Sequence, residues 1–205
     1  MKIKLIDAGK RFNREWVFRH ADLEFVSGTA YAITGPNGSG KSTLLQAIAC
    51  LLEPSEGKLS FWKNDQELPI EKGYQYISFC APYLDSVEEM TLIEFLHFHK
   101  EFKPFITGFD AVKIIDTIGL QTATNKQIRN FSSGMKQRVK LAQAIFSDTP
   151  VILLDEPCTN LDAAGIELYQ QLIKQHCLDR IVIVSSNDKV EYGFCEVEIE
   201  IRQFK

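Results

Sequence analysis

The chain has no long apolar run and little of what a disulfide or metal framework needs. Its longest unbroken apolar run is six residues, Ala47 to Leu52, whereas a helix needs roughly 20 to span a bilayer. The five cysteines form no Cys-x-x-Cys pair and their number is odd, which argues against a disulfide framework. His97 and His99 are two residues apart, so on a helix they would point in different directions. We therefore expect neither a membrane span nor a metal site built from Cys and His.

An excess of positive charge is also missing. The chain has 23 Lys and Arg against 27 Asp and Glu, a net charge of −4, so we expect no nucleic-acid partner. The hydrophobic fraction of 45% and the charged fraction of 24% are typical of globular proteins. Polar residues interrupt the first five positions, unlike a signal peptide. We expect a protein that stays in the cytoplasm.

Apolar patterns predict alternating strands and helices. Strands are expected at about 3–6, 23–26, 30–34, 59–62, 74–80, 151–154 and 181–184. Helices are expected at about 41–52, 92–98 and 112–118, the second with Thr91 and Glu94 at the spacing of a capping box. This order predicts an α/β fold with a largely parallel sheet core and an antiparallel N-terminal β region. We predict one domain over 1–205, with core segments at about 1–81 and 147–205 and an inserted helical subdomain at about 82–146.

A glycine-rich loop between an apolar strand and an apolar helix carries the strongest signal. It matches the pattern GxxxxGK[ST] and consists of Gly35, Pro36, Asn37, Gly38, Ser39, Gly40, Lys41, Ser42 and Thr43. Glycines let backbone N–H groups approach an anion, and the following helix directs its positive end to the same place. Lys41 is suited to the β- and γ-phosphates of a nucleotide and Ser42 to Mg²⁺. The loop predicts a P-loop NTPase fold that binds ATP with Mg²⁺ as cofactor.

Two acids follow the apolar segment Val151 to Leu154. Asp155 and Glu156 would lie at the carboxyl end of a buried strand, where α/β sheets bind their ligands. We expect Asp155 to hold Mg²⁺ and Glu156 to orient the attacking water or accept its proton. A solvent-exposed acidic turn is the alternative interpretation.

A segment before this strand resembles the signature of ATP-binding cassette (ABC) ATPases. Phe131-Ser132-Ser133-Gly134-Met135 is followed by a Gln-Arg pair, and the family usually has LSGGQ at this place. Pro157 to Asp162 resembles the D-loop of that family. The order of motifs covers essentially the whole chain and matches a separate nucleotide-binding subunit of a transporter.

The resemblance implies a head-to-tail dimer with two ATP molecules between its subunits. Ser132 and the backbone N–H of Gly134 would contact the γ-phosphate bound to the other subunit's P-loop. Phe12 or Trp16 could be the aromatic residue that stacks on adenine. The resemblance also implies a separate integral-membrane subunit, and hence a cytoplasmic protein that is peripheral on the cytoplasmic face of the membrane.

The sequence departs from the family at four places. Ser133 and Met135 replace a glycine and the last glutamine of the signature, and the D-loop has Cys158 and Thr159 where Thr-Ser is commoner. The Q-loop glutamine, expected at about 81 or 82, is replaced by Ala or Pro, neither of which can ligate a metal or position a water.

The fourth departure is the absence of the switch histidine. Ser186 or Asn187 stands in its place, and we assign Asn187 because Glu191 then has the usual spacing. Asn187 can donate a hydrogen bond but cannot carry a proton.

We predict an ATP-hydrolysing transporter subunit with Glu156, Lys41 and Asn187 as catalytic residues, and with slow turnover. The partners would be a second ABC subunit, identical or not, and the membrane subunit. Two alternatives are a non-transport ABC ATPase that acts as a switch, and a degenerate module that binds ATP with little hydrolysis.

Overall fold

A computed structural model describes residues 1–177 and 179–205. Its centre is a five-stranded parallel sheet in the order β6-β7-β8-β3-β9. The strands are β3 (Thr29–Thr34), β6 (Ile77–Cys80), β7 (Val151–Asp155), β8 (Ile181–Ser185) and β9 (Val197–Glu200). Every residue of β7 and β8 is buried, as the unbroken apolar runs predicted.

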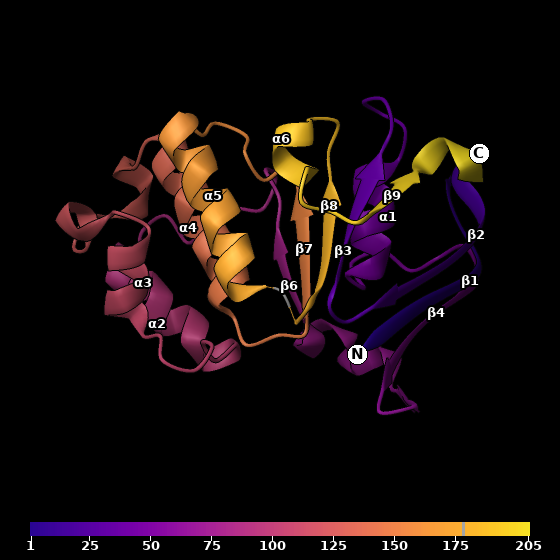
Figure 1. Cartoon of the computed structure of the whole chain (residues 1–205), viewed down its shortest axis with the longest axis horizontal. Helices are drawn as coiled ribbons and strands as arrows, with labels where there is room; N and C mark the ends of the chain where they lie inside the picture. The colour runs from indigo at the N-terminus through magenta and orange to yellow at the C-terminus, as the bar shows by residue number, and fades with distance from the viewer. Residues whose placement is uncertain (178) are drawn as a thin grey trace.

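A second, antiparallel sheet lies beside the first (Figure 1). Its strand order is β2-β1-β4-β5, and all of its pairs are antiparallel. The strands are β1 (Lys2–Phe12), β2 (Glu15–Val26), β4 (Glu56–Lys63) and β5 (Gln66–Leu68). The predicted α/β class, with a parallel core and an antiparallel N-terminal region, is confirmed.

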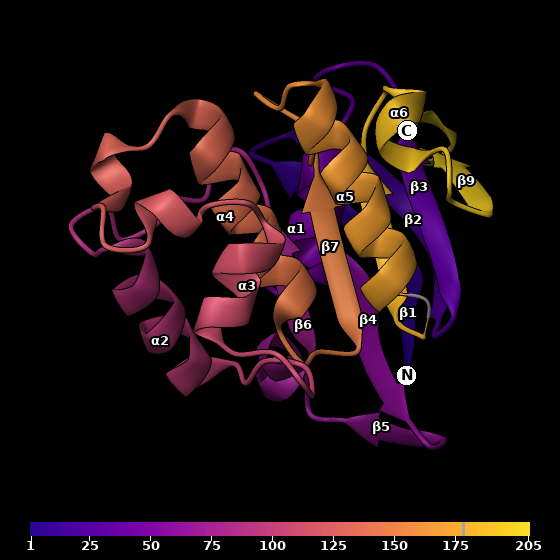
Figure 2. The ribbon, with the colours of Figure 1, turned by 60° about the vertical axis from the view of Figure 1, so that its left-hand side comes forward.

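The parallel sheet has a hydrophobic core on each face, because successive strand residues point to opposite sides. Ile33, Leu153 and Ile183 face α1 (Lys41–Ile48) and the antiparallel sheet. Ala32 and Leu154 face the helical side, where α4 (Ser133–Phe146) and α5 (Ala163–His176) pack. Helices α1 and α4 therefore lie on opposite faces of the sheet, as Figures 1 and 2 show.

The chain between β6 and β7 carries α2 (Leu92–Phe102), α3 (Ala111–Thr117) and α4. The predicted capping box is present: the N–H of Glu94 donates to Thr91 Oγ1, and the N–H of Thr91 donates to a Glu94 carboxylate oxygen at 2.9 Å. Gly119 has φ 70° directly after Ile118, the C-cap of α3, which is a common ending of a helix. Shorter elements are α6 (Lys189–Tyr192) and the 3₁₀ turns η1 (Ile70–Tyr76), η2 (Gln121–Ala123), η3 (Ile128–Asn130) and η4 (Ile201–Phe204).

The helix expected at 92–98 continues to Phe102, and the strands expected at 3–6 and 23–26 are longer than predicted. Two other predicted segments are too long. Helix α1 ends at Ile48 rather than about Leu52, because Cys50 adopts φ 59°. The N–H groups of Cys50 and Leu51 then bond to the carbonyls of Ala47 and Gln46, which is a Schellman ending. The expected strand at 74–80 begins only at Ile77, because the residues before it form η1.

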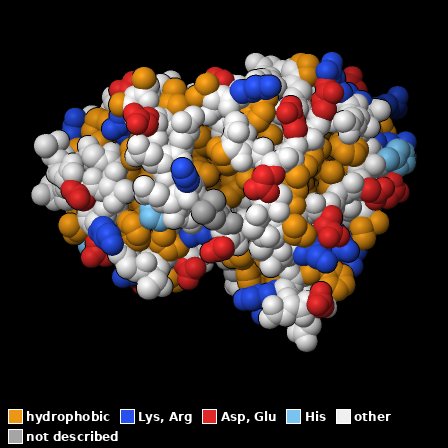
Figure 3. All heavy atoms as spheres, viewed as in Figure 1, with side chains coloured by type: hydrophobic (Ala, Val, Ile, Leu, Met, Phe, Trp, Pro, Cys, Tyr) orange, Lys and Arg blue, Asp and Glu red, His pale blue; other side chains and the backbone are white. Residues whose placement is uncertain are grey.

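Acidic and basic side chains are interspersed on the face of the molecule in Figure 3. Within the described ranges, no helix is both long and apolar enough to cross a membrane.

Candidate nucleotide site

The glycine-rich loop joins the carboxyl end of β3 to the start of α1. Gly35, Gly38 and Gly40 have φ of 138°, 74° and 106°, conformations that L-residues rarely adopt. A Cβ on Gly40 would lie 2.4 Å from Val17 Cγ1 of β2, so the antiparallel sheet leaves room only for glycine there. Gly40 is also the N-cap of α1 and provides no side-chain hydrogen bond to it. The first N–H groups of α1 thus have no side-chain cap, and these are the groups that bind phosphate in P-loops.

Lys41 is 5% exposed, and its ammonium group points back into the loop. Its Nζ donates to the carbonyl oxygens of Gly35 at 2.7 Å and Pro36 at 3.3 Å. Burial lowers the pKa of Lys41, and the nearby Glu156 and Asp155 oppose this shift. The ammonium is therefore held beside the strand that carries the two acids, where it can exchange carbonyl oxygens for phosphate oxygens.

Asn187, after β8, contacts the same loop from the other side. Its Oδ1 accepts a hydrogen bond from the N–H of Gly35 at 3.1 Å, and its Nδ2 donates to Asn37 Oδ1 at 3.1 Å. Ser186, the other residue considered for this position, is 2% exposed and its Oγ accepts from the N–H of Asp188. Asn187 is thus the residue that contacts the P-loop.

Asp155 ends β7 and is 2% exposed. Its Oδ1 is buried and has no hydrogen-bond partner in the part of the chain that is described. Such an oxygen is costly to bury unless a ligand satisfies it. Ser42 is the second residue of α1 and is partly buried. A buried carboxylate oxygen and a serine hydroxyl are oxygen ligands of the kind Mg²⁺ prefers, so the residues fit this ion.

Glu156 is exposed and has φ 44°. This conformation costs a non-glycine residue about 1–3 kcal/mol, and such strain is concentrated at functional sites. The N–H of Glu156 donates to the Ser185 carbonyl at 2.9 Å, which continues the β7–β8 pairing for one residue. The strand pairing therefore holds Glu156 next to Asp155 while the backbone turns.

The segment expected to hold the Q-loop glutamine follows β6. Ala81 is fully buried, and neither it nor Pro82 can reach a metal. Tyr83 lies near this corner, since Gln46 of α1 and Asp155 both influence its pKa. Burial is the main cause that raises the pKa of Tyr83 to about 12. Sequence analysis gave Tyr83 no role at the nucleotide site, because the phenol is not the family's side chain for that place.

Ser132 and Gly134 lie at the start of α4. Ser132 is the N-cap, and its Oγ accepts from the N–H of Met135 at 3.2 Å. A Cβ on Gly134 would lie 3.0 Å from the carbonyl oxygen of Asn160, so the signature packs against the D-loop. Since α4 and α1 lie on opposite faces of the sheet, the structure does not show Ser132 and Gly134 together with the P-loop of the same chain.

Side chains from two helices hold the D-loop. Gln137 of α4 donates to the Pro157 carbonyl oxygen at 2.6 Å. Glu191 of α6 accepts from the N–H of Cys158 at 2.7 Å, and burial raises the pKa of its carboxyl group. This loop therefore connects the signature helix to the segment after Asn187.

The two candidate adenine-stacking residues differ in how free their rings are. Phe12 is 50% exposed at the end of β1, with Lys10 Nζ 5.4 Å from its ring centroid. The guanidinium groups of Arg19 and Arg11 lie 4.5 and 5.4 Å from the Trp16 ring centroid. The ring of Trp16 already stacks with two cations, so Phe12 is the more available of the two.

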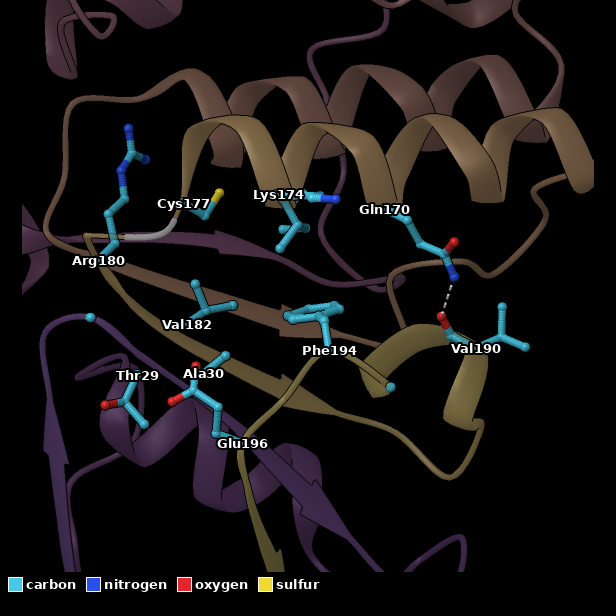
Figure 4. Close-up of a pocket in the computed structure, with 13 residues that line it drawn as sticks. Thr29, Ala30, Gln170, Lys174, Cys177, Arg180, Val182, Val190, Phe194 and Glu196 are labelled. Atoms are coloured by element: carbon cyan, nitrogen blue, oxygen red, sulfur yellow. Dashed lines mark hydrogen bonds between the residues drawn. The ribbon is translucent and has the colours of Figure 1, made fainter.

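A separate cavity of about 510 Å³ lies between α5 and the strands β3 and β8 (Figure 4). Val182 and Phe194 line its apolar part, and Gln170 Nε2 donates across its rim to the Val190 carbonyl at 2.9 Å. Thr29 and Arg180 place it at the amino ends of the strands. Ligands of parallel sheets bind at the carboxyl ends, so this cavity is distinct from the nucleotide site.

Comparison with known proteins agrees with the motifs. The sequence profile of the ABC transporter family matches residues 18–159. The cytochrome c biogenesis ATP-binding export protein CcmA of Bradyrhizobium diazoefficiens is 36% identical over 163 residues, which cover 78% of each chain. An uncharacterized ABC transporter ATP-binding protein of Bacillus subtilis, YybJ, is 28% identical over 97% of this chain and 92% of its own length.

Solved structures share the fold. A putative ABC transporter ATP-binding protein of Pyrococcus furiosus superposes with a TM-score of 0.83 at 22% identity, covering 100% of both chains. The cassette MJ0796, a dimer in a post-hydrolysis state bound to ADP and Pi, has a TM-score of 0.82 at 25% identity, covering 97% of this chain and 94% of its own. With its P-loop, acidic strand end and signature helix in one cassette fold, the chain belongs to the ABC family of transporter ATPases.

Proposed function

We propose that this chain is the ATP-hydrolysing subunit of a membrane transporter and that it works as a dimer which ATP closes. The observation that carries this proposal is the convergence of Lys41, Asp155, Glu156 and Asn187 on the uncapped start of α1. Family members hydrolyse ATP, and relatives named as ATP-binding export proteins support a role in transport.

Each of these residues has a role that its position supports. Lys41 would bind the β- and γ-phosphates in place of its present carbonyl partners. Ser42 and Asp155 would hold Mg²⁺, which when bound neutralises charge on the phosphates. Glu156, exposed next to Asp155, would orient the attacking water and accept its proton. Asn187 would keep the loop in its binding conformation through the N–H of Gly35 and the amide of Asn37.

A second cassette completes the site in this proposal. Ser132 and Gly134 lie at the start of α4, on the face of the sheet opposite α1, so they would meet the γ-phosphate bound to another subunit. Backbone N–H groups at a helix start stabilise such charge. Closure then depends on the γ-phosphate, and its hydrolysis opens the dimer.

A membrane partner is proposed to dock near β6 and α2. Exposed apolar side chains lie on α2, among them Phe98 at 44% and Phe102 at 70%, whose rings pack edge to face 5.0 Å apart. Tyr83 and Val87, in the segment after β6, are also exposed, whereas Phe95 of α2 is buried in the core. Docking to a membrane protein would hold the chain peripherally on the cytoplasmic face.

The test is ATP turnover with Mg²⁺ for the wild type beside Glu156→Gln. Loss of the carboxylate should lower turnover at least about 10²-fold, the usual effect of removing one transition-state contact. Affinity for ATP should remain, because Glu156 does not belong to the phosphate-binding loop. Glu167→Gln, an exposed glutamate of α5, is the matched control and should leave turnover unchanged.

Two results would contradict the proposal. Turnover that is equal in the wild type and Glu156→Gln would assign the activity to another group or to a contaminant. Tight ATP binding without turnover, alone and with a co-purifying membrane protein, would favour the degenerate ATP-binding module.

A further inference from the structure

Asn187 bridges two points of the P-loop, and the chemistry of one of them fixes how both asparagine amides are oriented. The N–H of Gly35 can only donate a hydrogen bond, so the Asn187 atom that faces it at 3.1 Å is the acceptor Oδ1. The Nδ2 of Asn187 donates to a different group, Asn37 Oδ1, at 3.1 Å. These two contacts hold the Asn187 amide at both its oxygen and its nitrogen.

The backbone of the loop holds Asn37 in place. The N–H of Ser39 donates to the Pro36 carbonyl at 3.0 Å, which closes a turn with Asn37 and Gly38 at its centre. Gly38 has φ 74°, as the third position of a type II turn requires. Asn37 itself is exposed, so the turn, rather than side-chain packing, presents its amide to Asn187.

The amide of Asn187 retains a donor that is not used. Its nitrogen carries two N–H groups, and one of them donates to Asn37. Across residues 1–177 and 179–205, the other N–H has no hydrogen-bond partner, and Asn187 is exposed. An amide does not titrate near neutral pH, so it keeps one acceptor and two donors where a histidine would change its charge.

We propose that Asn37 is a positioning residue for Asn187: it holds the amide so that the second N–H can donate to the γ-phosphate of ATP. The inference rests on the proposed function, in which ATP binds to this loop. ADP has no γ-phosphate, so this hydrogen bond favours ATP alone. Asn37 thus contributes to the selectivity of the site for ATP over ADP by acting through another side chain.

The experiment measures the affinities for ADP and for a non-hydrolysable ATP analogue in Mg²⁺, at a protein concentration where light scattering shows monomers. Asn37→Ala removes the acceptor. We expect the ratio of the two affinities, analogue over ADP, to fall about tenfold, the usual contribution of a hydrogen bond to a charged group. The affinity for ADP should stay the same, because its phosphates bind to the N–H groups of α1 and to Lys41. A merely structural role of Asn37 would lower both affinities and leave their ratio unchanged.

Asn187→Ala shows whether Asn37 acts through Asn187. This variant should lower the ratio at least as much as Asn37→Ala does, and the double variant should have the same ratio as Asn187→Ala alone. Asn125→Ala removes another exposed asparagine side chain, in the turn between η2 and η3, and should change neither affinity. The melting temperature of each variant shows whether it folds.

Two results would overturn the inference. An unchanged ratio in a folded Asn37→Ala variant would show that Asn37 does not orient a donor to the γ-phosphate. A further fall of the ratio when Asn37→Ala is added to Asn187→Ala would show that Asn37 binds the phosphate with its own amide.

Failure of the proposed function gives a different pattern. A wild type without turnover whose ratio falls in Asn37→Ala, and falls no further in the double variant than in Asn187→Ala, supports the inference and contradicts only hydrolysis. A wild type that binds the analogue and ADP equally contradicts the γ-phosphate contact of Asn187 and the inference together.

Discussion

Helix α1 begins differently from the other α-helices in the described part of the chain. In α2 to α6, an N-cap side chain accepts a hydrogen bond from a backbone N–H of the first turn; these residues are Thr91, Asp110, Ser132, Asp162 and Asp188. Helix α1 begins after Gly40, at φ 106°, with no side-chain cap. A side-chain cap contributes about 1 kcal/mol, so α1 lacks a stabilisation that its neighbours have.

This difference indicates that the start of α1 is the helix start at which a ligand can bind. An anion can satisfy the unpaired N–H groups of α1, as phosphate does in P-loops. At α4, by contrast, Ser132 satisfies an N–H of its own helix and is exposed at the same time. We infer that the start of α1 binds the nucleotide. The start of α4 is capped by its own side chain and would contact the nucleotide only in a dimer.

The largest effect should come from mixing two inactive variants. Lys41→Ala removes phosphate binding, and Ser132→Ala removes the signature contact, so each homodimer should lose about 10²–10³-fold in turnover. In a mixed head-to-tail dimer, one site combines both defects and the other has neither. Mixing the two purified proteins should therefore restore a substantial part of the wild-type turnover.

Binding measurements on the separate variants sharpen this result. Ser132→Ala should keep the wild-type affinity for ATP, whereas Lys41→Ala should lose it. Full turnover in Ser132→Ala, or no recovery in the mixture, would show that the start of α4 does not act across a dimer.

The second prediction is that acid lowers the free energy of unfolding through His99, which lies in the helical part of the molecule. This side chain of α2 is 9% exposed, its Nε2 bonds to Ser147 Oγ at 2.8 Å, and its Nδ1 to Gln143 Nε2 at 3.0 Å. Burial first, and Lys103 second, lower the pKa of His99 from 6.5 to about 4. Between these values the unfolded chain binds the proton more tightly, so stability present above about pH 6.5 is lost as the pH falls toward 4.

Urea unfolding near pH 7.5 and near pH 5 measures this loss. The difference in pKa corresponds to a loss of about 2 kcal/mol in the free energy of unfolding over that interval. His99→Gln cannot titrate and should lose less. The carboxyl group of Glu191 is buried and its pKa is raised, so it adds stability as the pH falls. It does so equally in both proteins, and the difference between their losses of stability therefore isolates His99. Equal losses would refute the assignment.

Sequence patterns identified the elements that have strong local signals. The apolar runs in β7 and β8 and the capping box of Thr91 are found. Weak or ambiguous signals failed. Strands β5 and β9 at the sheet edges were not predicted, since they are short and mostly exposed. The end of α1 was placed too late, because a cysteine at φ 59° gives no sign of a stop.

In the candidate site, too, some residues could be predicted from the sequence and others could not. Motif spacing singled out Lys41, Asp155 and Asn187 before any geometry was available, and the structure brings them together. The proximity of Tyr83 to Asp155, which influences the pKa of Tyr83, depends on a turn after β6 and on the packing against Phe79. No local pattern contains such a tertiary contact, so it could only be found in the fold.

The smallest effect concerns the caps themselves. Thr91→Ala removes the hydrogen bond that Thr91 Oγ1 accepts from the N–H of Glu94 at the start of α2. The backbone N–H of residue 91 can still donate to Glu94, and the free energy of unfolding should fall by about 1 kcal/mol. Thr91→Ser keeps a hydroxyl at this position and should retain most of the stability. ATP affinity should be unchanged in both, because the phosphate binds to the start of α1. Urea unfolding and equilibrium ATP binding check the two statements separately. An equal loss of stability in the serine variant would indicate that the methyl group, not the cap, stabilises α2, and a loss of ATP affinity would show that the two helix starts are coupled.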